Sequence, residues 1–341
     1  MYYAAQIVKL PKAYIYYISV IFVMNIKNET LSEDNIEVLF DIYKTSLFRH
    51  PYLNPYNLYR RKLNLGFKLK LLLFKDQGYV AYISQRFLFN TYLLPGIIDS
   101  LESYMDIYSF LKRKFVYNIS NIIHFYINSK ELLDIYIREF RSLDQDIFID
   151  VIYDSNVRLN KAQRHRIHIN LKKAIQNGIK VRFIQHLESD SFREWYNNCY
   201  TYAYDNKPPF TYSQLYEYTQ YLLEHDLEKF TIAEVDGKIL GGIGILMDQY
   251  SNIAWYNLGA ICKEGREKGA GYLLMNTAIE VVRENGKIFE LYGKSRSDQD
   301  SKHVGIFEFK KIFSREVEIP YYSSNNFIIK LLRLFSALKG R

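Results

Sequence analysis

The stretch of this 341-residue chain with the clearest chemical content is Arg266-Glu267-Lys268-Gly269-Ala270-Gly271. It lies between residues 252–260, which predict a strand, and residues 272–284, which predict a helix ended by Asn285-Gly286. Glycines let a ligand approach the backbone, and the first N–H groups of a helix can bind a phosphate. Arg266 and Lys268 add positive charge there. The segment therefore predicts an anion-binding turn. The alternative is a surface loop whose glycines only permit a tight bend.

Residues 156–177 predict a basic helix with Ile167, Leu171, Ala174 and Ile175 on one face and Gly178 as its C-terminal cap. Residues 293–303, after the turn, are polar and predict a loop.

The elements between that helix and the glycine turn follow a regular order. The pattern predicts helices over residues 191–204 and 211–225, the second opened by a capping box from Thr211 to Gln214. Strands are predicted over residues 230–235 and 238–247, joined by a hairpin turn at Asp236-Gly237. The returning strand carries three glycines, which we expect to allow a bulge or the close approach of a ligand backbone: Gly241, Gly242 and Gly244.

This order of elements, together with Arg266-x-x-Gly-x-Gly, resembles the GNAT N-acyltransferases. In that family the glycine turn binds the pyrophosphate of acyl-coenzyme A, and backbone N–H groups of the preceding strand polarise the thioester carbonyl. The resemblance implies acetyl-CoA or another acyl-CoA as the cosubstrate, with no metal. The residues it assigns to coenzyme binding are Leu258, Ala260, Ile261, Arg266, Lys268, Gly269, Ala270 and Gly271.

Two further segments narrow the resemblance. Residues 164–174 followed by Asn177-Gly178-Ile179, and the segment 305–313 with its Phe-Lys-Lys run, are similar to the Fem-type acyltransferases. That group includes peptidoglycan-bridge aminoacyltransferases, which use aminoacyl-tRNA, and acyltransferases of polysaccharide clusters. It implies an α/β (α+β) fold of tandem GNAT-like domains, each a mixed, mostly antiparallel sheet flanked by helices. The expected divisions are an extension at 1–24, a degenerate domain at 25–155, the acyltransferase domain at 156–320 and a basic amphipathic helical segment at 321–341.

Acyl transfer to an amine also needs a group that removes a proton from the amine, directly or through one water. Glu234, at the end of a predicted strand, and Glu290, on the strand after the coenzyme helix, are the two candidate bases. Tyr256 and Tyr292 are the candidate acids for the leaving thiolate. By resemblance, Lys310 of the Phe-Lys-Lys run helps to hold charge during transfer. For each residue the competing interpretation is structural, as a solvated charge or a packed tyrosine.

The remaining chemically active residues are sparse. His50 and His124 are isolated in the sequence, which favours surface or packing roles over ligation. The chain has two cysteines, Cys199 and Cys262, too few for a disulfide framework or a cysteine zinc site, and a reducing compartment fits this usage. Cys262 lies next to the glycine turn, but no neighbouring residue in the sequence suggests a base for a nucleophilic thiol. The expected localisation is cytoplasmic, or peripheral to the inner face of the membrane.

The net charge and the two terminal segments suggest binding partners but no catalytic residues. The formal net charge of +8 suits polyanions such as coenzyme A, tRNA or phospholipid. Residues 13–24 are apolar but shorter than the ~20 residues of a membrane span, and Met24 is an alternative start. Residues 327–338 predict an amphipathic helix, for the membrane surface or for docking on protein.

Three functions are consistent with these features. The first is an N-acyltransferase that moves an acyl group from acyl-CoA to an amine on a small-molecule or lipid-linked acceptor, such as an amino-sugar or cell-envelope precursor. The second is an aminoacyl-tRNA-dependent transferase of the peptidoglycan-bridge type. The third is a non-catalytic GNAT-like binding protein. The Arg266–Gly271 segment favours the first, because it matches a coenzyme A turn.

Overall fold

The computed structural model describes most of the chain between residues 26 and 324. The described residues are 26–46, 49–74, 78–84, 90–94, 97, 118–121, 144–153, 158–184, 187–295 and 301–324. The predictions for residues 1–24, for His124 and for the helix at 327–338 lie outside these ranges. In the part of the chain that is described, no helix is long and apolar enough to cross a membrane.

The elements of the first half are β1 (Ile26–Glu29), α2 (Glu33–Thr45), η1 (Pro51–Leu53), α3 (Pro55–Leu63), β2 (Leu69–Phe74), β3 (Gly78–Ser84), β4 (Asn90–Leu94), β5 (Asn118–Asn121) and β6 (Asp144–Tyr153). Those of the second half are α7 (Lys161–Gln176), β7 (Lys180–Ile184), α8 (Ser189–Trp195), η2 (Tyr196–Tyr200), α9 (Thr201–Ala203), α10 (Tyr212–Glu224), β8 (Glu228–Val235), β9 (Lys238–Met247), β10 (Ile253–Ile261), α11 (Lys263–Lys268), α12 (Ala270–Glu284), β11 (Ile288–Glu290), β12 (Lys294–Ser295), α13 (Ser301–Lys311) and β13 (Arg315–Ser324).

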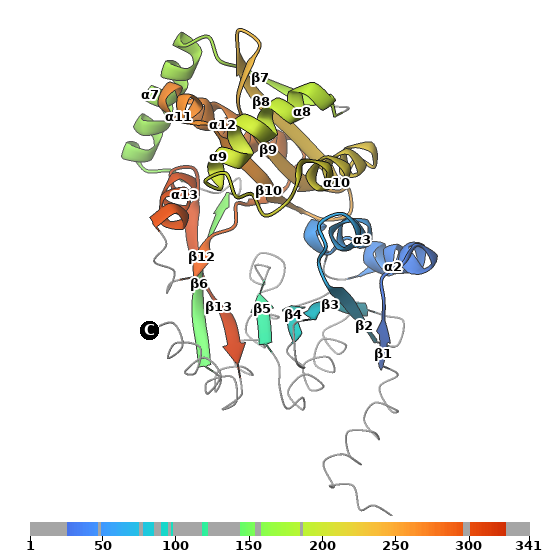
Figure 1. The fold of residues 1–341 in the computed structure, drawn as a ribbon. Helices are drawn as coiled ribbons and strands as arrows, with labels where there is room; N and C mark the ends of the chain where they lie inside the picture. The colour runs from blue at the N-terminus through green and yellow to red at the C-terminus, as the bar shows by residue number, and fades with distance from the viewer. Residues whose placement is uncertain are drawn as a thin grey trace, which may run out of the picture.

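The described strands form one mixed sheet in the order β1-β2-β3-β4-β5-β13-β6-β11-β10-β9-β8-β7, with β12 paired to β6. Each half contains an antiparallel run of three strands followed by a parallel pair: β2-β3-β4 with β5, and β8-β9-β10 with β11. Helices precede each run, and Figure 1 shows the two halves joined through the sheet. The predicted fold class, a mixed α/β sheet flanked by helices in two GNAT-like halves, is confirmed.

The two halves are joined by an exchange of strands. β6 ends before residue 155, yet it pairs antiparallel with β11 of the second half. β13 pairs antiparallel with β6 along its length and also with β5 of the first half. Figure 1 shows β6 and β13 side by side in the middle of the sheet. The last strand of each half, β6 or β13, therefore pairs with strands of the other half. A boundary near residue 155 can be drawn in the sequence, but the sheet is continuous across it.

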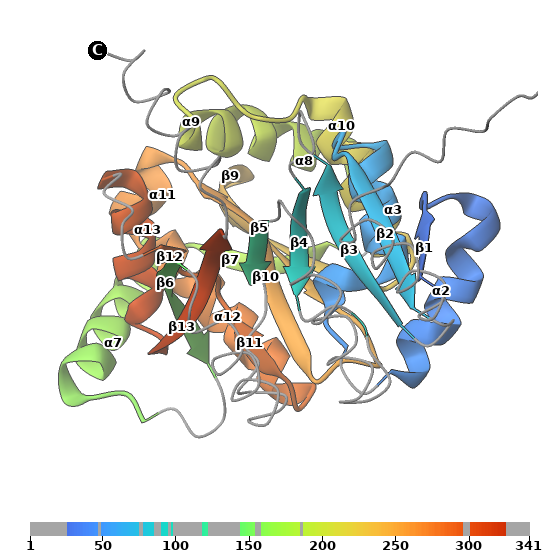
Figure 2. The ribbon, with the colours of Figure 1, turned by 90° about the horizontal axis from the view of Figure 1, so that it is seen from below.

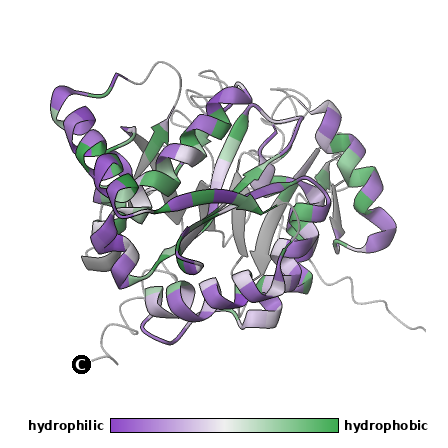
Figure 3. Cartoon of the chain, turned by 90° about the horizontal axis from the view of Figure 1, so that it is seen from above, coloured by the Kyte–Doolittle hydropathy of each residue, from purple (hydrophilic) through white to green (hydrophobic). Residues whose placement is uncertain are grey.

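Two hydrophobic cores cover the two faces of the second-half sheet. One core lies under α2, α3, α8 and α10 and includes Trp195 and Trp255. The other lies under α7, α12 and α13 and includes Leu274 and Phe289. Green and purple alternate along the helices in Figure 3, as expected for amphipathic helices that lie on a sheet. The first half therefore packs, through α2 and α3, on one face of the second-half sheet.

Several local predictions are confirmed. β9 has the predicted bounds, and the turn before it has Asp236 and Gly237 both with positive φ, at 49° and 78°. Gly178 ends the helix before β7 with φ of 71°, and Thr211 and Gln214 form the predicted capping box. These features depend on neighbouring residues, which is why the sequence predicted them.

Other local features differ in detail from the predictions. The helix expected over 191–204 runs from Ser189 to Ala203, and η2 within it is π-helical. Ile175, expected on the apolar face of the preceding helix, is 66% exposed, whereas Ala174 is fully buried. The polar segment before residue 305 was expected to be a loop, but α13 begins at Ser301. β13 continues to Ser324, beyond the expected end of the acyltransferase domain at residue 320.

Candidate functional site

The clearest irregularity of the sheet lies where β10 and β11 separate. They pair in parallel through three positions, the last being Trp255 opposite Glu290. β10 then continues to Ile261, still paired with β9. From Tyr256 onward, β10 therefore runs without a β11 partner. Alternate N–H groups of that edge are free of sheet pairing and can bind a ligand carbonyl.

A β-bulge marks the same point. The register between β10 and β9 shifts between Tyr256 and Leu258, so Asn257 is the extra residue. The Asn257 side chain points to the face covered by the first half, where Oδ1 accepts a hydrogen bond from Arg61 Nη2 at 2.6 Å. Its Nδ2 donates to Glu228 Oε1 at 2.7 Å. The bulge thus places an amide beside the separation of the two strands.

The glycine segment follows β10, as predicted, but it is more helical than a simple turn. Residues 263–268 form α11, Gly269 is left-handed with φ of 89°, and α12 begins at Ala270. Arg266 and Lys268 lie on α11. The Arg266 guanidinium is 5.2 Å from the Tyr202 ring, and Lys268 Nζ is 2.8 Å from Glu264 Oε1.

Helix α7 covers this segment. Gly269 is buried, and a Cβ built on it would lie 2.9 Å from the Asn170 carbonyl oxygen and 3.5 Å from the Ala174 Cβ. Arg166 Nε donates to the Tyr272 hydroxyl at 3.0 Å. The face of the glycine segment toward α7 is therefore closed by protein, while Arg266 remains exposed. This packing differs from the open turn that the sequence predicted.

The three other coenzyme residues predicted on β10 lie just before this segment. Ala260 is buried in the core beneath the first half, and Leu258 packs against the same core. Ile261 packs against the opposite core, where its side chain would be 2.7 Å from a Cβ on Gly271. The structure therefore brings the predicted β10 residues and the glycine segment to one end of α12.

Glu290 forms a buried pair with a residue of the first half. Both side chains are fully buried, and His50 Nε2 is 3.0 Å from Glu290 Oε2. His50 Nδ1 accepts the Tyr52 backbone N–H at 3.1 Å, so the proton of a neutral imidazole lies on Nε2, which donates to Glu290. Burial raises the pKa of Glu290 well above its usual range and lowers the pKa of His50 to about 3. Glu290 thus favours the protonated form, which suits a hydrogen-bond donor better than a base.

The pairing of His50 corrects the prediction that it is isolated. It is isolated in the sequence, but the fold brings it to Glu290, and its ring also lies 6.2 Å from that of Trp255. The expected packing role holds, and a surface role is excluded.

Tyr292 and Lys310 meet just beyond Glu290. The Lys310 ammonium donates to the carbonyl oxygens of Leu291 and Tyr292, the latter at 3.0 Å, and lies 4.3 Å from the Tyr256 ring centre. Tyr292 has φ of 59°, its side chain is 40% exposed, and its ring lies 6.0 Å from Trp255. Three of the four predicted catalytic residues, Glu290, Tyr292 and Lys310, therefore lie together at the separation of β10 and β11.

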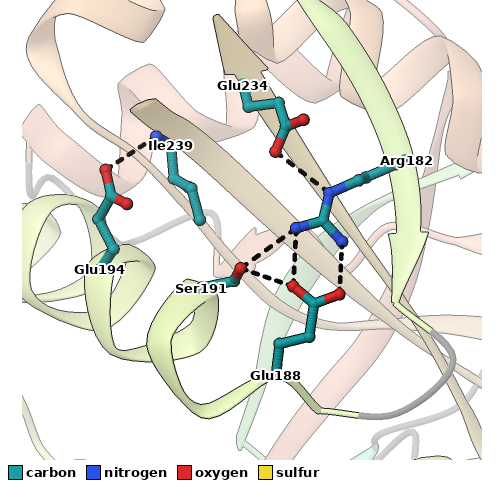
Figure 4. Close-up of polar contacts among 6 residues, drawn as sticks. All are labelled: Arg182, Glu188, Ser191, Glu194, Glu234 and Ile239. Atoms are coloured by element: carbon teal, nitrogen blue, oxygen red, sulfur yellow. Dashed lines mark hydrogen bonds and ion pairs between the residues drawn. The ribbon is translucent and has the colours of Figure 1, made fainter. Parts of the chain in front are cut away.

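Glu234 lies elsewhere. It is near the end of β8, which is separated from β11 by β9 and β10 in the sheet order, and Glu234 Oε2 accepts from Arg182 Nε at 3.1 Å. The same guanidinium makes a bidentate pair with Glu188, which also accepts from Ser191 (Figure 4). Glu234 is thus part of a surface ion-pair network, and the structure does not bring it to the other three predicted residues.

The sequence reasoning missed Glu228, at the start of β8. Its side chain is 1% exposed and lies across Gly244 of β9, where an added Cβ would be 2.3 Å from Glu228 Oε1. The strand glycines thus make room for protein side chains rather than for a ligand backbone, since Gly242 similarly faces Trp195. One signal was available: Glu228 is in phase with Phe230 and Ile232, two buried residues of the same strand face.

Within the described ranges, no group of three or more His, Cys, Asp or Glu residues is arranged to hold a metal ion.

The order of elements and the separation of β10 from β11 are typical of a GNAT-type domain. Residues 189–304 match the model of the acetyltransferase (GNAT) family. The expected resemblance to this family is confirmed for the part of the chain that holds β8 to β11 and the glycine segment. Among curated protein sequences, none matches the chain.

The fold of nearly the whole chain is similar to that of several solved structures. The crystal structure of FemX has a TM-score of 0.61 at 10% identity, covering 90% of this chain and 99% of that one. The C-terminal domain of a protein described as a lysylphosphatidylglycerol synthetase, from Agrobacterium fabrum, has a TM-score of 0.60 at 13% identity, covering 89% and 95%. L-PGS from Bacillus licheniformis has a TM-score of 0.58 at 12% identity, covering 92% and 98%.

Proposed function

We propose that this protein is an N-acyltransferase that moves an acyl group from acyl-CoA to the amine of an amino-sugar or a related cell-envelope precursor. The observation that carries the proposal is the end of the β10–β11 pairing at Trp255 and Glu290, beside the glycine segment. An acyl donor placed along the free edge of β10 would present its carbonyl to the N–H groups of residues 258–261. One such donor hydrogen bond contributes roughly 3 kcal/mol to stabilising the oxyanion.

Three residues are proposed to act around that carbonyl. Lys310 holds the backbone of residues 291–292 in place and brings positive charge to the site. Tyr292, partly exposed, is placed to protonate the leaving thiolate. Glu290 retains its proton because of burial and serves as a donor or as an anchor for His50.

The donor is proposed from the motif. Arg266-x-x-Gly-x-Gly at the start of α12 favours acyl-CoA, because the first turn of a helix and a nearby cation suit a pyrophosphate. Arg266 is exposed and Lys268 half-buried, so both can contribute charge from the side opposite α7.

A second candidate function is transfer of an aminoacyl group from tRNA. It is favoured by the packing of α7 over Gly269, which closes one side of the coenzyme turn. The similarity over nearly the full length to FemX and to lysylphosphatidylglycerol synthetases supports the same candidate. In both candidates the reaction site is the free edge of β10, and the difference lies in the donor.

Calorimetric titration of acetyl-CoA separates the two. We expect the wild-type protein to bind acetyl-CoA and Arg266→Ala to bind it at least tenfold more weakly. Arg283→Ala is the matched control, because Arg283 is an exposed arginine at the other end of α12. Gly271→Val is unsuitable, since its side chain would strike Ile261 and Phe309.

Equal weakening by both arginine substitutions would contradict a site on the glycine segment. No binding of acetyl-CoA, together with transfer of an amino acid from charged tRNA, would replace the first function by the second. Absence of transfer to glucosamine from either donor would overturn the proposed function.

A further inference from the structure

A polar network lies beneath the first half, on the face of β10 opposite α12. Its members come from α3, α10, β8 and β10, and α3 and α10 lie side by side in Figure 2. At its centre Asn257 bridges Arg61 and Glu228, as described above. The Tyr218 hydroxyl donates to Asn57 Oδ1 at 2.7 Å. The cluster thus links Arg61 to Asn257, 196 positions apart, and Asn57 to Tyr218, 161 positions apart.

Of the two carboxylate oxygens of Glu228, only one has a hydrogen-bond partner among the described residues. Oε1 accepts from Asn257, but Oε2 is buried and has no hydrogen-bond partner among the described residues. A buried carboxylate oxygen without a partner is costly, roughly 1–3 kcal/mol, so its retention favours a functional role. Two other buried groups nearby are also unpartnered in the described chain, Arg61 Nε and Trp255 Nε1. The Arg61 guanidinium lies 5.6 Å from the Trp255 ring, so these groups share one region.

The surroundings of the buried Arg61 guanidinium are unusual, because an amide and aromatic rings contact it. In the described part of the chain, no carboxylate forms an ion pair with it; Asn257 stands between it and Glu228. Aromatic rings surround the guanidinium instead, with ring centres at 4.4 Å for Tyr52 and 5.5 Å for Tyr218. The positive charge of Arg61 therefore acts on Glu228 without a direct contact, and Glu228 Oε2 keeps no partner among the described residues.

The position along β10 connects this cluster to the reaction site. Asn257 directly precedes Leu258, the first of the residues whose N–H groups are proposed to face the acyl carbonyl. Trp255, which contributes an unpartnered indole N–H, is the last residue paired with β11. Glu228 thus lies on the side of the sheet opposite α12, and its hydrogen bond to the half-buried Asn257 connects it to the free part of β10.

We propose that Glu228 accepts the proton of the attacking amine, and that Arg61, contributed by the first half, positions Glu228 and adjusts its basicity through Asn257. The inference rests on the proposed acyl transfer. The protonated amine gives one proton to Glu228 Oε2, directly or through one water. Its nitrogen then forms the C–N bond and the C–S bond of the thioester breaks. Tyr292 gives its hydroxyl proton to the leaving sulfur, and the nitrogen's second proton restores the Tyr292 hydroxyl. Glu228 finally returns its proton to solvent.

The electrostatic setting suits this role. Burial raises the pKa of Glu228 to about 7, against the hydrogen bond from Asn257 and the charge of Arg61, which both lower it. The charged and titratable groups that face it are Arg61 from α3 and Tyr218 from α10, and Tyr52 from η1 lies against Arg61. β9 offers only Gly244 at this point, and β10 offers the neutral Asn257. A base whose pKa lies near the working pH is the most effective proton acceptor.

The test compares two glutamates on the same strand. Glu228→Gln and Glu234→Gln are assayed for transfer from acetyl-CoA to glucosamine as a function of pH, with acetyl-CoA affinity and thermal unfolding measured beside them. All variants share the titration of glucosamine, so differences between their profiles report on the protein. We expect Glu228→Gln to lose the acidic limb near neutral pH and at least a hundredfold in kcat/KM, with acetyl-CoA affinity unchanged. Glu234→Gln should match the wild type.

Two further variants guard against a purely structural effect. Glu228→Asp keeps a carboxylate, so the acidic limb should remain while the rate falls. Arg61→Met removes the positive charge and should move the acidic limb to higher pH. An unchanged limb in Glu228→Gln, or loss of the limb in Glu234→Gln, would overturn the proposal while leaving acyl transfer intact. Absence of transfer by the wild type would instead overturn the proposed function.

Discussion

His50 of the first half and Glu290 of the second half share one buried hydrogen bond, with 3.0 Å between Nε2 and Oε2. They are 240 positions apart in the sequence. The bond fixes the segment before η1 against the end of β11, at the point where β10 and β11 separate. The first half thereby supports the reaction site directly.

This relationship predicts the effect of His50→Ala. The substitution removes the hydrogen bonds that His50 makes to Glu290 and to the Tyr52 N–H and leaves a cavity, so we expect a loss of about 2–4 kcal/mol in unfolding free energy. His225→Ala is the control, because His225 is exposed and stacks on Tyr221 with ring centres 3.9 Å apart. Urea unfolding of both variants checks the prediction, and equal losses would contradict it.

The pKa of Glu228 predicts a pH dependence of stability. The native carboxyl holds its proton up to about pH 7, whereas an ordinary glutamate loses it near pH 4.5. Between these values the folded state binds more protons, so the unfolding free energy should fall as pH rises, by up to about 3 kcal/mol. The contribution is complete below the lower value and lost above the upper one. Chemical denaturation of wild type and Glu228→Gln across this window tests it. A wild-type slope no steeper than that of the variant would contradict it.

The arrangement across β9 predicts a second stability effect. Gly244→Ala places a Cβ 2.3 Å from Glu228 Oε1 and must displace that side chain, at a cost of about 1–3 kcal/mol. Gly305→Ala, in the exposed part of α13 with open space around the new Cβ, should be neutral or stabilise by up to about 1 kcal/mol. Thermal unfolding distinguishes them. A Gly244→Ala protein as stable as the wild type would show that Glu228 is not held across this glycine.

Features that depend only on neighbouring residues were predicted correctly from the sequence. The hairpin at Asp236-Gly237 and the cap at Gly178 are set by their own backbone needs, and both were found where expected. Glu290 and Tyr292 were predicted from the chemistry of acyl transfer and Lys310 from the resemblance, and these three residues do meet in the structure. Glu290 and Tyr292 lie at the end of β11, and Lys310 reaches them from α13.

What the sequence could not predict depends on pairing between distant elements. The positions of His50 and Arg61 follow from how α3 and η1 pack on β10, which no local pattern states. Glu234 and Glu228 are both glutamates of β8. Only the pairing of β8 with its neighbours shows that Glu234 contacts Arg182 and that Glu228 contacts Asn257. The cover of Gly269 by α7 was equally hidden, because an amphipathic helix does not reveal which surface it covers.

Two adjacent lysines of α13 give a further test. Lys310 is buried and donates to the carbonyl oxygens of Leu291 and Tyr292, so Lys310→Met should cost about 1–3 kcal/mol and reduce transfer strongly. Lys311 forms half-exposed ion pairs with Glu308 and Glu316, so Lys311→Met should cost less than about 1 kcal/mol and leave transfer unchanged. Unfolding and transfer rates are measured on the same preparations. Full activity in a destabilised Lys310→Met would assign this lysine a structural role alone.

The last prediction concerns Cys262, which caps α11 beside the glycine segment. Its Sγ accepts the Gly265 N–H at 3.4 Å, and a hydrogen bond from Cys199 is the largest influence lowering the pKa of Cys262. Cys199 is buried, and the pKa of its thiol is raised by the same contact and by burial. Iodoacetamide at neutral pH should therefore modify Cys262 first, since the thiolate is the reactive form.

Peptide mass analysis after timed alkylation identifies the modified cysteine, and Cys262→Ser should abolish the fast phase. Acetyl-CoA bound along the end of β10 should slow the modification, because Cys262 directly follows Ile261 there. The same protection should be weaker in Arg266→Ala and retained in Arg283→Ala, as for binding. Faster modification of Cys199 would contradict the assigned thiol order. Modification of Cys262 at a rate independent of bound acetyl-CoA would place the donor away from the glycine segment.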